Sequence, residues 1–229
     1  MARRCPWGRA AARRTGRNRC APPAPQPPPG CRFGRDAAPV PFPHETPYAD
    51  HAPDAPGADR LRPIPLTGDL GDALPCTIAI PAIGVSAALA GVGRDAAGRV
   101  AAPPADEPGL AGWYAAGPTP GRPGAAVIVG NPLGSPGAGF ARLGDLACGD
   151  IVGIVRADDT VAVFRVTGTE RVPWDDFPES RVHGPVDGPE LRLIAGAGRY
   201  DADARSHPAR VIVYAAFTAA YRLTDLASL

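Results

Sequence analysis

Side chains that could act as nucleophiles or proton carriers are few in this sequence, which has five cysteines and four histidines among 229 residues. Cys5, Cys20 and Cys31 lie in a proline-rich beginning, whereas Cys76 and Cys148 stand alone. No Cys-x-x-Cys or His-x-x-x-His spacing is present, so the sequence predicts no zinc site. We expect Cys76 and Cys148 to be small apolar fillers, with a disulfide or a reactive role as the alternatives.

The acidic pairs give no better reason to expect a bound ion. Asp158-Asp159 and Asp175-Asp176 lie in segments rich in turn-forming residues, where such pairs are usually only solvated. The stretch 130–139 is glycine-rich but has no lysine, so it does not match a phosphate-binding loop. We therefore expect neither a metal nor a cofactor.

The charge of the chain is unevenly distributed. All 24 basic residues are arginine, and alanine, glycine and proline are abundant, which is typical of a GC-rich coding sequence rather than of a nucleic-acid-binding protein. Residues 1–35 contain nine arginines and no acid, so residues 36–229 carry a net charge of −8 within a total of +1. We expect an acidic folded part and no nucleic-acid partner.

The chain divides into a tail and one domain. Residues 1–73 are rich in proline and arginine and show no helical or alternating apolar pattern, so we expect them to be disordered. A signal peptide would contain an apolar run of about 7 to 15 residues, and these residues contain none. No stretch of about 18 apolar residues, as a membrane helix would require, is present either. Residues 74–229 are long enough for one domain with a full core.

Short strands dominate the expected secondary structure of that domain. Apolar runs bounded by turn residues predict strands at 125–131, 191–195 and 210–216. Residues 151–156 and 161–166 alternate enough to be an antiparallel, half-exposed hairpin around Asp158-Asp159. Residues 77–85 read as one strand interrupted by Pro81, and a helical turn is expected near 174–177. Seven or eight short strands with little helix favour an all-β, closed barrel.

The stretch from Gly188 to Gly198 is a buried strand that runs into a glycine-rich turn. Its Leu-Arg-Leu-Ile-Ala-Gly segment resembles the active-site strand of the actinobacterial class F sortases, which reads Leu-Arg-Leu-Ile-Thr-Cys-Gly-Gly. In this alignment Ala195 stands in the place of the threonine and Gly196 in the place of the nucleophilic cysteine.

Several other motifs resemble the same family in the same order. They are Ile-Pro-Ala-Ile-Gly-Val at 80–85, Gly-Trp-Tyr at 112–114, the Gly-x-x-Pro-Gly type loop at 117–124, and the connector at 140–150. The resemblance covers Cys76 to about Phe217 and implies the sortase-type barrel.

The family resemblance implies three catalytic groups, and each has a position here. A sortase uses a cysteine as nucleophile, a histidine as proton carrier and an arginine for the oxyanion. The cysteine position is Gly196, and the histidine position is Asn131, whose amide cannot shuttle a proton near neutral pH. The arginine is Arg210, or else the family's arginine position falls two residues earlier, at Pro208.

Further residues follow from the same alignment. Ala195, Gly130 and His207 are candidates for contact with a bound peptide, and His207 lies in the loop before the last strand, where it could approach a cleft. His183 stands where the family commonly has an aromatic residue, so we expect it to pack rather than react. Cys148 should lie on another face of the barrel.

Two functions remain open. The first is a sortase-like barrel that has lost transpeptidation and keeps at most a cleft for an extended, sorting-signal-like peptide, as a binding or regulatory module or a decaying gene copy. The second is an active sortase whose chemistry has moved to other residues. The resemblance implies a monomer at the cell surface or outside the cell, with a membrane anchor that this sequence does not encode. A cytoplasmic location and a misplaced recorded start are the alternatives.

The resemblance also makes a geometric prediction. Residues 127–130, 191–195 and 211–215 should be neighbouring barrel strands, because the three family positions must converge on one cleft. The Cα atoms of Asn131 and Gly196 should then lie within about 12 Å of each other, the span of two contacting side chains.

Overall fold

The fold is given by a computed structural model that describes residues 63–104, 107, 109–130, 139–198 and 207–226. Residues 1–62 of the segment 1–73 that was predicted to be disordered lie outside these described residues, and so does Asn131. Within them the chain forms eight strands and four short helical segments. In chain order they are β1 (Pro75–Ile80), η1 (Pro81–Ile83), β2 (Val85–Val92), β3 (Leu110–Tyr114), β4 (Gly124–Gly130), η2 (Gly139–Asp145), β5 (Ile151–Arg156), β6 (Thr160–Pro173), α1 (Glu179–His183), β7 (Pro189–Ala197), β8 (Ala209–Arg222) and α2 (Leu223–Leu226).

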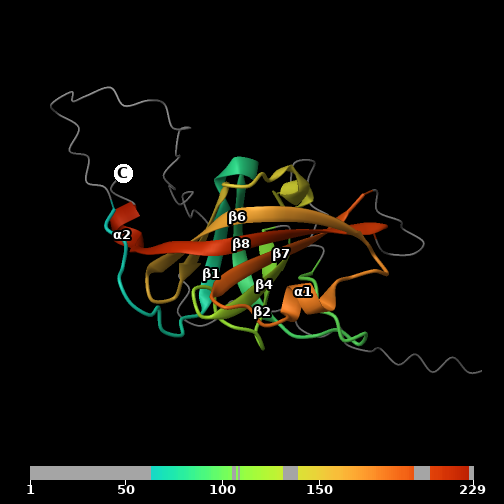
Figure 1. The fold of residues 1–229 in the computed structure, drawn as a ribbon, viewed down its shortest axis with the longest axis horizontal. Coiled ribbons are helices and arrows are strands. Elements are labelled where there is room, and N and C mark those ends of the chain that lie inside the picture. The colour runs from blue at the N-terminus through green and yellow to red at the C-terminus, as the bar shows by residue number, and fades with distance from the viewer. Residues whose placement is uncertain (1–62, 105–106, 108, 131–138, 199–206, 227–229) are drawn as a thin grey trace, which may run out of the picture.

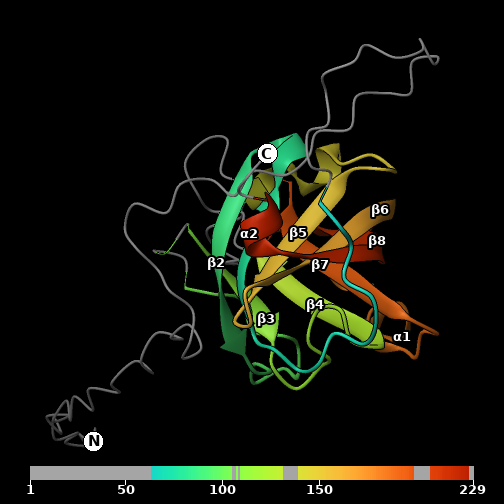
Figure 2. The ribbon, with the colours of Figure 1, turned by 90° about the vertical axis from the view of Figure 1, so that its left-hand side faces the viewer.

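The strands close into one barrel in the order β1-β2-β3-β4-β7-β8-β6-β5. The β2–β3 and β4–β7 pairs are parallel, and the other pairs are antiparallel. Figure 1 shows β6, β8 and β7 side by side, with α1 beside β4 and β7. Figure 2 shows α2 at the C-terminal end of β8. The predicted all-β closed barrel of seven or eight strands with short helical turns is confirmed.

The first expected strand is in fact two. Residues 75–80 form β1, Pro81 opens the 3-10 turn η1, and β2 starts at Val85, which pairs with Ile80 across the hairpin. Proline suits the first position of such a turn because its φ is fixed and its missing N–H is not needed there. Gly84 closes the turn with φ of +67°, a conformation that glycine adopts without strain. The prediction of a single strand through Pro81 was therefore wrong.

The β5–β6 hairpin is present, but β5 is not half exposed as predicted. Its residues after Ile151 are buried: Val152 and Ile154 face the barrel interior, and α2 covers Val155 on the outer face. Arg156, at the end of the strand, is covered by residues 70–71. The strand β6 also continues to Pro173, and the helix that follows lies at 179–183 rather than at 174–177. The longer β6 is held by pairing with β8 along its whole length.

Two sides of the β7 strand pack against different clusters. Leu191, Leu193 and Ala195 face the barrel interior, where the largest apolar cluster lies. Ile194 faces outward and packs under α1 in a second cluster. The period of two along a strand makes this alternation necessary, so Gly196 also belongs to the outward-facing series. That outer cluster comprises Val127, Val172, Val182, Ile194 and Ile212, with Val100, Tyr114, Val129, Phe177 and Tyr214 at its edge.

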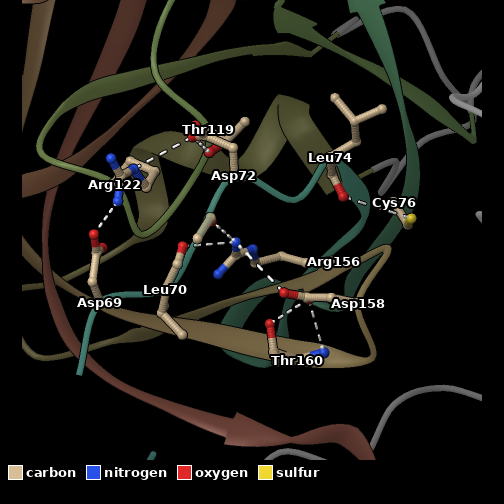
Figure 3. Close-up of polar contacts among 11 residues, drawn as sticks. Asp69, Leu70, Asp72, Leu74, Cys76, Thr119, Arg122, Arg156, Asp158 and Thr160 are labelled. Carbon is tan, nitrogen blue, oxygen red and sulfur yellow. Dashed lines mark hydrogen bonds and ion pairs between the residues drawn. The ribbon is translucent and has the colours of Figure 1, made fainter. Parts of the chain in front are cut away.

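Residues 66–74, which we call the strap, lie against the barrel end where β8 finishes. The backbone N–H of Leu66 donates to the carbonyl of Ala220, and Arg156, whose side chain is fully buried, donates to the carbonyls of Leu70 (3.0 Å) and Gly71. Figure 3 shows Arg156 between these carbonyls and Asp158, 3.7 Å away. This part of the N-terminal segment is thus tied to the domain.

A second arginine reinforces the strap from the loop before β4. Arg122 pairs with Asp69 and lies 3.4 Å from Asp72, whose carboxylate also accepts a hydrogen bond from the Thr119 hydroxyl (3.3 Å) (Figure 3). These contacts are exposed, so their contribution to stability is small beside that of the buried Arg156.

Neither cysteine of the described domain is the apolar filler that we expected. Cys76 in β1 is buried but disulfide-bonded, with its partner outside the described residues. Cys148 is a free, exposed thiol that donates to the carbonyl of Thr167 at 3.2 Å. The sequence around an isolated cysteine does not show whether the folded chain pairs it with a distant cysteine or exposes it to solvent.

The helical segments are all short. None that the structure describes has the length and the apolar run needed to cross a membrane as a helix.

Candidate functional site

The three strands that should carry the family positions are adjacent. β4 and β7 pair in parallel, with Gly130 beside Ala195, and β7 and β8 pair antiparallel, with Gly196 beside Arg210. The predicted neighbourhood of residues 127–130, 191–195 and 211–215 is confirmed. Asn131 follows Gly130 in the chain but is not among the described residues, so its expected distance from Gly196 stays a prediction.

The space above Gly196 is filled by a histidine ring. A Cβ atom built on Gly196 would lie 2.4 Å from Cδ2 and 2.8 Å from Cγ of His207, far inside van der Waals contact. His207 Nδ1 is 3.0 Å from the carbonyl oxygen of Gly198, which fixes one side of the ring. His207 does therefore approach the family's cysteine position, and it occupies the volume that a cysteine side chain would need.

Arg210 lies across from Gly196 on the same outward face of the sheet, because directly paired residues of neighbouring strands point to the same side. It is 8% exposed. Its Cζ lies 3.8 Å from the ring centroid of Trp174 and 4.7 Å from that of Phe177. Burial lowers the pKa of Arg210, and the positive charge of Arg99 acts in the same direction.

The aromatic partners of Arg210 are positioned by the β6–β8 ladder. Val172 pairs with Arg210 and Pro173 with Ala209, and the backbone N–H of Trp174 then donates to the carbonyl of Pro208 at 3.1 Å. The ladder thereby places the Trp174 indole beside the guanidinium. Arg99, from the β2–β3 loop, also contacts Trp174, with its Cζ 5.3 Å from the ring centroid.

Trp174 and Phe177 were not predicted to be site residues. Their signal was an aromatic pair three residues apart in an otherwise polar loop. That spacing indicates a local turn, but it cannot show that both rings meet an arginine far along the chain.

Gly130 and Ala195 lie beneath this site rather than on it. Ala195 is 2% exposed and belongs to the interior cluster. A Cβ on Gly130 would lie 1.9 Å from the ring of Phe140, so only glycine fits there. The two residues bring β4 and β7 together, and neither directs a side chain to the outer face.

His183 packs, as its position predicted. Its ring makes an edge-to-face contact with Tyr114, with centroids 5.7 Å apart, and Nε2 lies 3.5 Å from a carboxylate oxygen of Glu179. Burial lowers the pKa of His183, although the charge of Glu179 opposes that shift. Its neighbours are α1 and β3 rather than Gly196.

The described cysteines lie away from Gly196. Cys76 is on β1, four strands from β7 in either direction around the barrel, and its sulfur is already in a disulfide. Cys148 precedes β5 and contacts β6, which is separated from β7 by β8. Among the described residues, then, no thiol reaches Arg210 or His207. Nor do three or more histidine, cysteine or acidic residues gather there as a metal site would require.

The fold is a closed, eight-stranded, mixed β-barrel. Gly196 lies near the end of β7, Arg210 pairs with it near the start of β8, and His207 lies just before β8. The family model described as "Sortase domain" matches residues 78–218, more than half of the chain. The protein belongs to the sortase domain family.

Solved structures of sortases are similar in fold. Sortase A from Listeria monocytogenes is 14% identical with a TM-score of 0.49, over 66% of this chain and 91% of that one. The SrtA sortase from Actinomyces oris is 20% identical with a TM-score of 0.49, over 73% and 91%. Sortase C from Streptococcus pneumoniae is 19% identical with a TM-score of 0.48, over 62% and 64%. No curated protein matches the chain.

Proposed function

We propose that this sortase-family domain, a member of class F by its motifs, has lost cysteine transpeptidase activity and binds an extended peptide without cleaving it. Sortases act on sorting-signal peptides, and we infer that a peptide of this kind is the partner. The end of β7 and β8 around Gly196 and Arg210, beyond the part of the outer face that α1 covers, is the surface that would receive it. A location at the cell surface follows from the family as part of the proposal.

The observation that supports this function best is the pairing of Gly196 with Arg210 beneath the ring of His207. Acyl transfer needs an atom that attacks the carbonyl, and glycine has none. In subtilisin, removing the nucleophile or the base lowers turnover by about 10⁶-fold. An arginine that remains can polarise a carbonyl or bind an anion, but it cannot start the reaction.

The second candidate function is an active sortase with a relocated nucleophile. Cys148 is the one free thiol of the described residues. It is on the far side of β8 from β7, which disfavours this reading. The experiment that separates the two functions is a turnover assay on the purified chain with a quenched fluorescent sorting-signal peptide and an amine acceptor.

We expect no cleavage, no transfer and no acyl-enzyme by mass spectrometry. Turnover by the unmodified protein that disappears in Cys148→Ala, or after alkylation of the thiols, would refute the inactive reading. Binding of the same peptide, measured by fluorescence anisotropy, tests the other half of the proposal.

A further inference from the structure

The guanidinium of Arg210 is buried and charged, yet it forms no hydrogen bond or ion pair with any residue in the described part of the chain. Its described contacts are the rings of Trp174 and Phe177. Cation–π contacts use the flat faces of these rings and leave the N–H groups of the guanidinium without an acceptor. Since a buried charge is unfavourable unless it is paired, a ligand that accepts these hydrogen bonds would be stabilised.

The acidic side chains nearest to Arg210 are already engaged. Asp95 accepts hydrogen bonds from the Arg99 guanidinium at 2.9 Å and from the backbone N–H of Ala97 at 2.8 Å. Glu179 is exposed and contacts His183. Arg99 also contacts Trp174, but its charge is paired with Asp95. An anion that reaches Arg210 therefore meets one guanidinium that has no acidic partner among the described residues, and no carboxylate in direct contact with Arg210.

The guanidinium of Arg210 favours a small planar anion at the end of a chain. Only 8% of the residue is exposed, and a terminal carboxylate needs less room beside it than a mid-chain carbonyl that is flanked by residues on both sides. A guanidinium offers a planar fork of donors that matches a carboxylate. Asp95 and Glu179, which both act on the charge of Arg210, disfavour a doubly charged phosphate.

We propose that Arg210 binds the α-carboxylate at the C-terminus of a peptide that ends at the Gly196–Arg210 pair of β7 and β8. In a sortase with its cysteine, an arginine meets negative charge only while a carbonyl is under attack. Here Gly196 offers no attacking atom, so the negative charge must arrive with the ligand. This inference rests on the proposed peptide-binding function and specifies the chemistry of the ligand: the free-acid end of a peptide.

The test compares two peptide pools that differ only at the C-terminus. A randomised pool of short peptides is made once as the free acid and once as the amide with an isotope label, and both are passed together over the immobilised full-length protein. Mass spectrometry gives the ratio of retained acid to retained amide. We expect enrichment of the free acid by about 10- to 150-fold, the range that a charge-assisted hydrogen bond supplies.

Three variants assign the effect. Arg210→Met removes the charge and should bring the ratio to about one, whereas Arg210→Lys, which keeps the charge but not the planar fork, should retain part of the preference. Arg222→Gln is the matched control, because Arg222 is an exposed arginine at the other end of the same strand. It should leave the ratio unchanged. Circular dichroism establishes that each variant is folded, and Arg210→Lys keeps the test valid if Arg210→Met does not fold.

The failures are distinguishable. Equal retention of both pools, or a preference that survives in Arg210→Met, would overturn the carboxylate site and leave peptide binding intact. Retention of neither pool would overturn peptide binding and the carboxylate site together. Displacement of bound peptide by inorganic phosphate at lower concentration than by acetate would show an anion site of the wrong kind and also overturn the inference.

Discussion

The contact between Gly196 and His207 predicts a measurable coupling between the two positions. In Gly196→Ala, the new Cβ would lie 2.4 Å and 2.8 Å from two ring atoms of His207 and 3.2 Å from its Cβ, so the whole histidine side chain must move. Overpacking of this kind costs about 1–3 kcal/mol. Replacing glycine by alanine inside a strand returns about 0.5–1 kcal/mol of backbone entropy. We expect a net loss of about 1–2 kcal/mol in the free energy of unfolding.

The same substitution should have a different effect when the ring is absent. In the His207→Ala background the two closest ring contacts are gone, so Gly196→Ala should be neutral or slightly stabilising. The coupling free energy of the double-mutant cycle should then be about 1–3 kcal/mol. Urea denaturation followed by tryptophan fluorescence measures all four proteins, and an unchanged m-value shows that the unfolded states are comparable.

A matched control is available in Gly168 of β6, where an added Cβ would meet nothing within 4 Å. Gly168→Ala should be neutral or stabilising in both backgrounds. If Gly196→Ala changes the free energy of unfolding by the same amount, within about 0.5 kcal/mol, with and without His207, the ring does not fill the nucleophile position and the reasoning is refuted.

Three further outcomes are expected. Turnover should appear only when Gly196→Cys and Asn131→His are combined, with His207→Gly to make room for the cysteine side chain. The new imidazole is needed both to ionise the thiol and to give a proton to the leaving amine. Activity of either single variant in the peptide-cleavage assay would contradict this prediction. Because burial lowers the pKa of His183 in the folded state, the unfolded chain binds the proton more readily, so this contribution to stability is present above the unfolded pKa of about 6.5 and lost as the pH falls below it. His183→Phe, which keeps an aromatic ring against Tyr114, should flatten that part of the stability–pH curve, and an unchanged curve would exclude His183 as its source. In a Cys76→Ser background, which removes the disulfide from both proteins, a chain that begins at residue 73 should be less stable than the full-length chain by about 2–4 kcal/mol, since Arg156 loses the carbonyls of Leu70 and Gly71. Adding Arg156→Met should recover part of the loss in thermal melts, and no recovery would show that the strap acts by other contacts.

The barrel and the location of the site could be predicted from the sequence because both depend on short-range patterns. Alternating or continuous apolar residues identify strands, and the run from Leu191 to Gly198 shows where a buried strand ends in flexible backbone. The turn at Pro81 was misjudged because a proline at a bulge and a proline that opens a 3-10 turn have the same local sequence. The difference is decided by the left-handed Gly84 and by pairing of Ile80 with Val85.

The parts that the sequence could not give depend on contacts between distant segments. That the end of β5 is buried follows from α2 and the strap, which come from opposite ends of the domain. That Arg210 stacks on Trp174 follows from the register of β6 on β8, and that His207 covers Gly196 follows from how the chain returns into β8. A residue type and its spacing predict which chemistry is available, but only the fold decides which side chain occupies a given volume.

The position of the strap has a mechanical consequence. The backbone N–H of Leu66 donates to the carbonyl of Ala220, and α2 follows directly after β8. The chain therefore enters and leaves the described domain at one end of the barrel (Figure 1). Arg210 lies at the opposite end of the same long strand. A force applied between residue 63 and residue 226 would load the strap, the end of β8 and the β5–β6 hairpin before it reached the paired start of β8. The surface around Arg210 would therefore keep its geometry under tension. If the domain were attached to a larger structure through residue 63 or residue 226, the surface around Arg210 would face away from the attachment point.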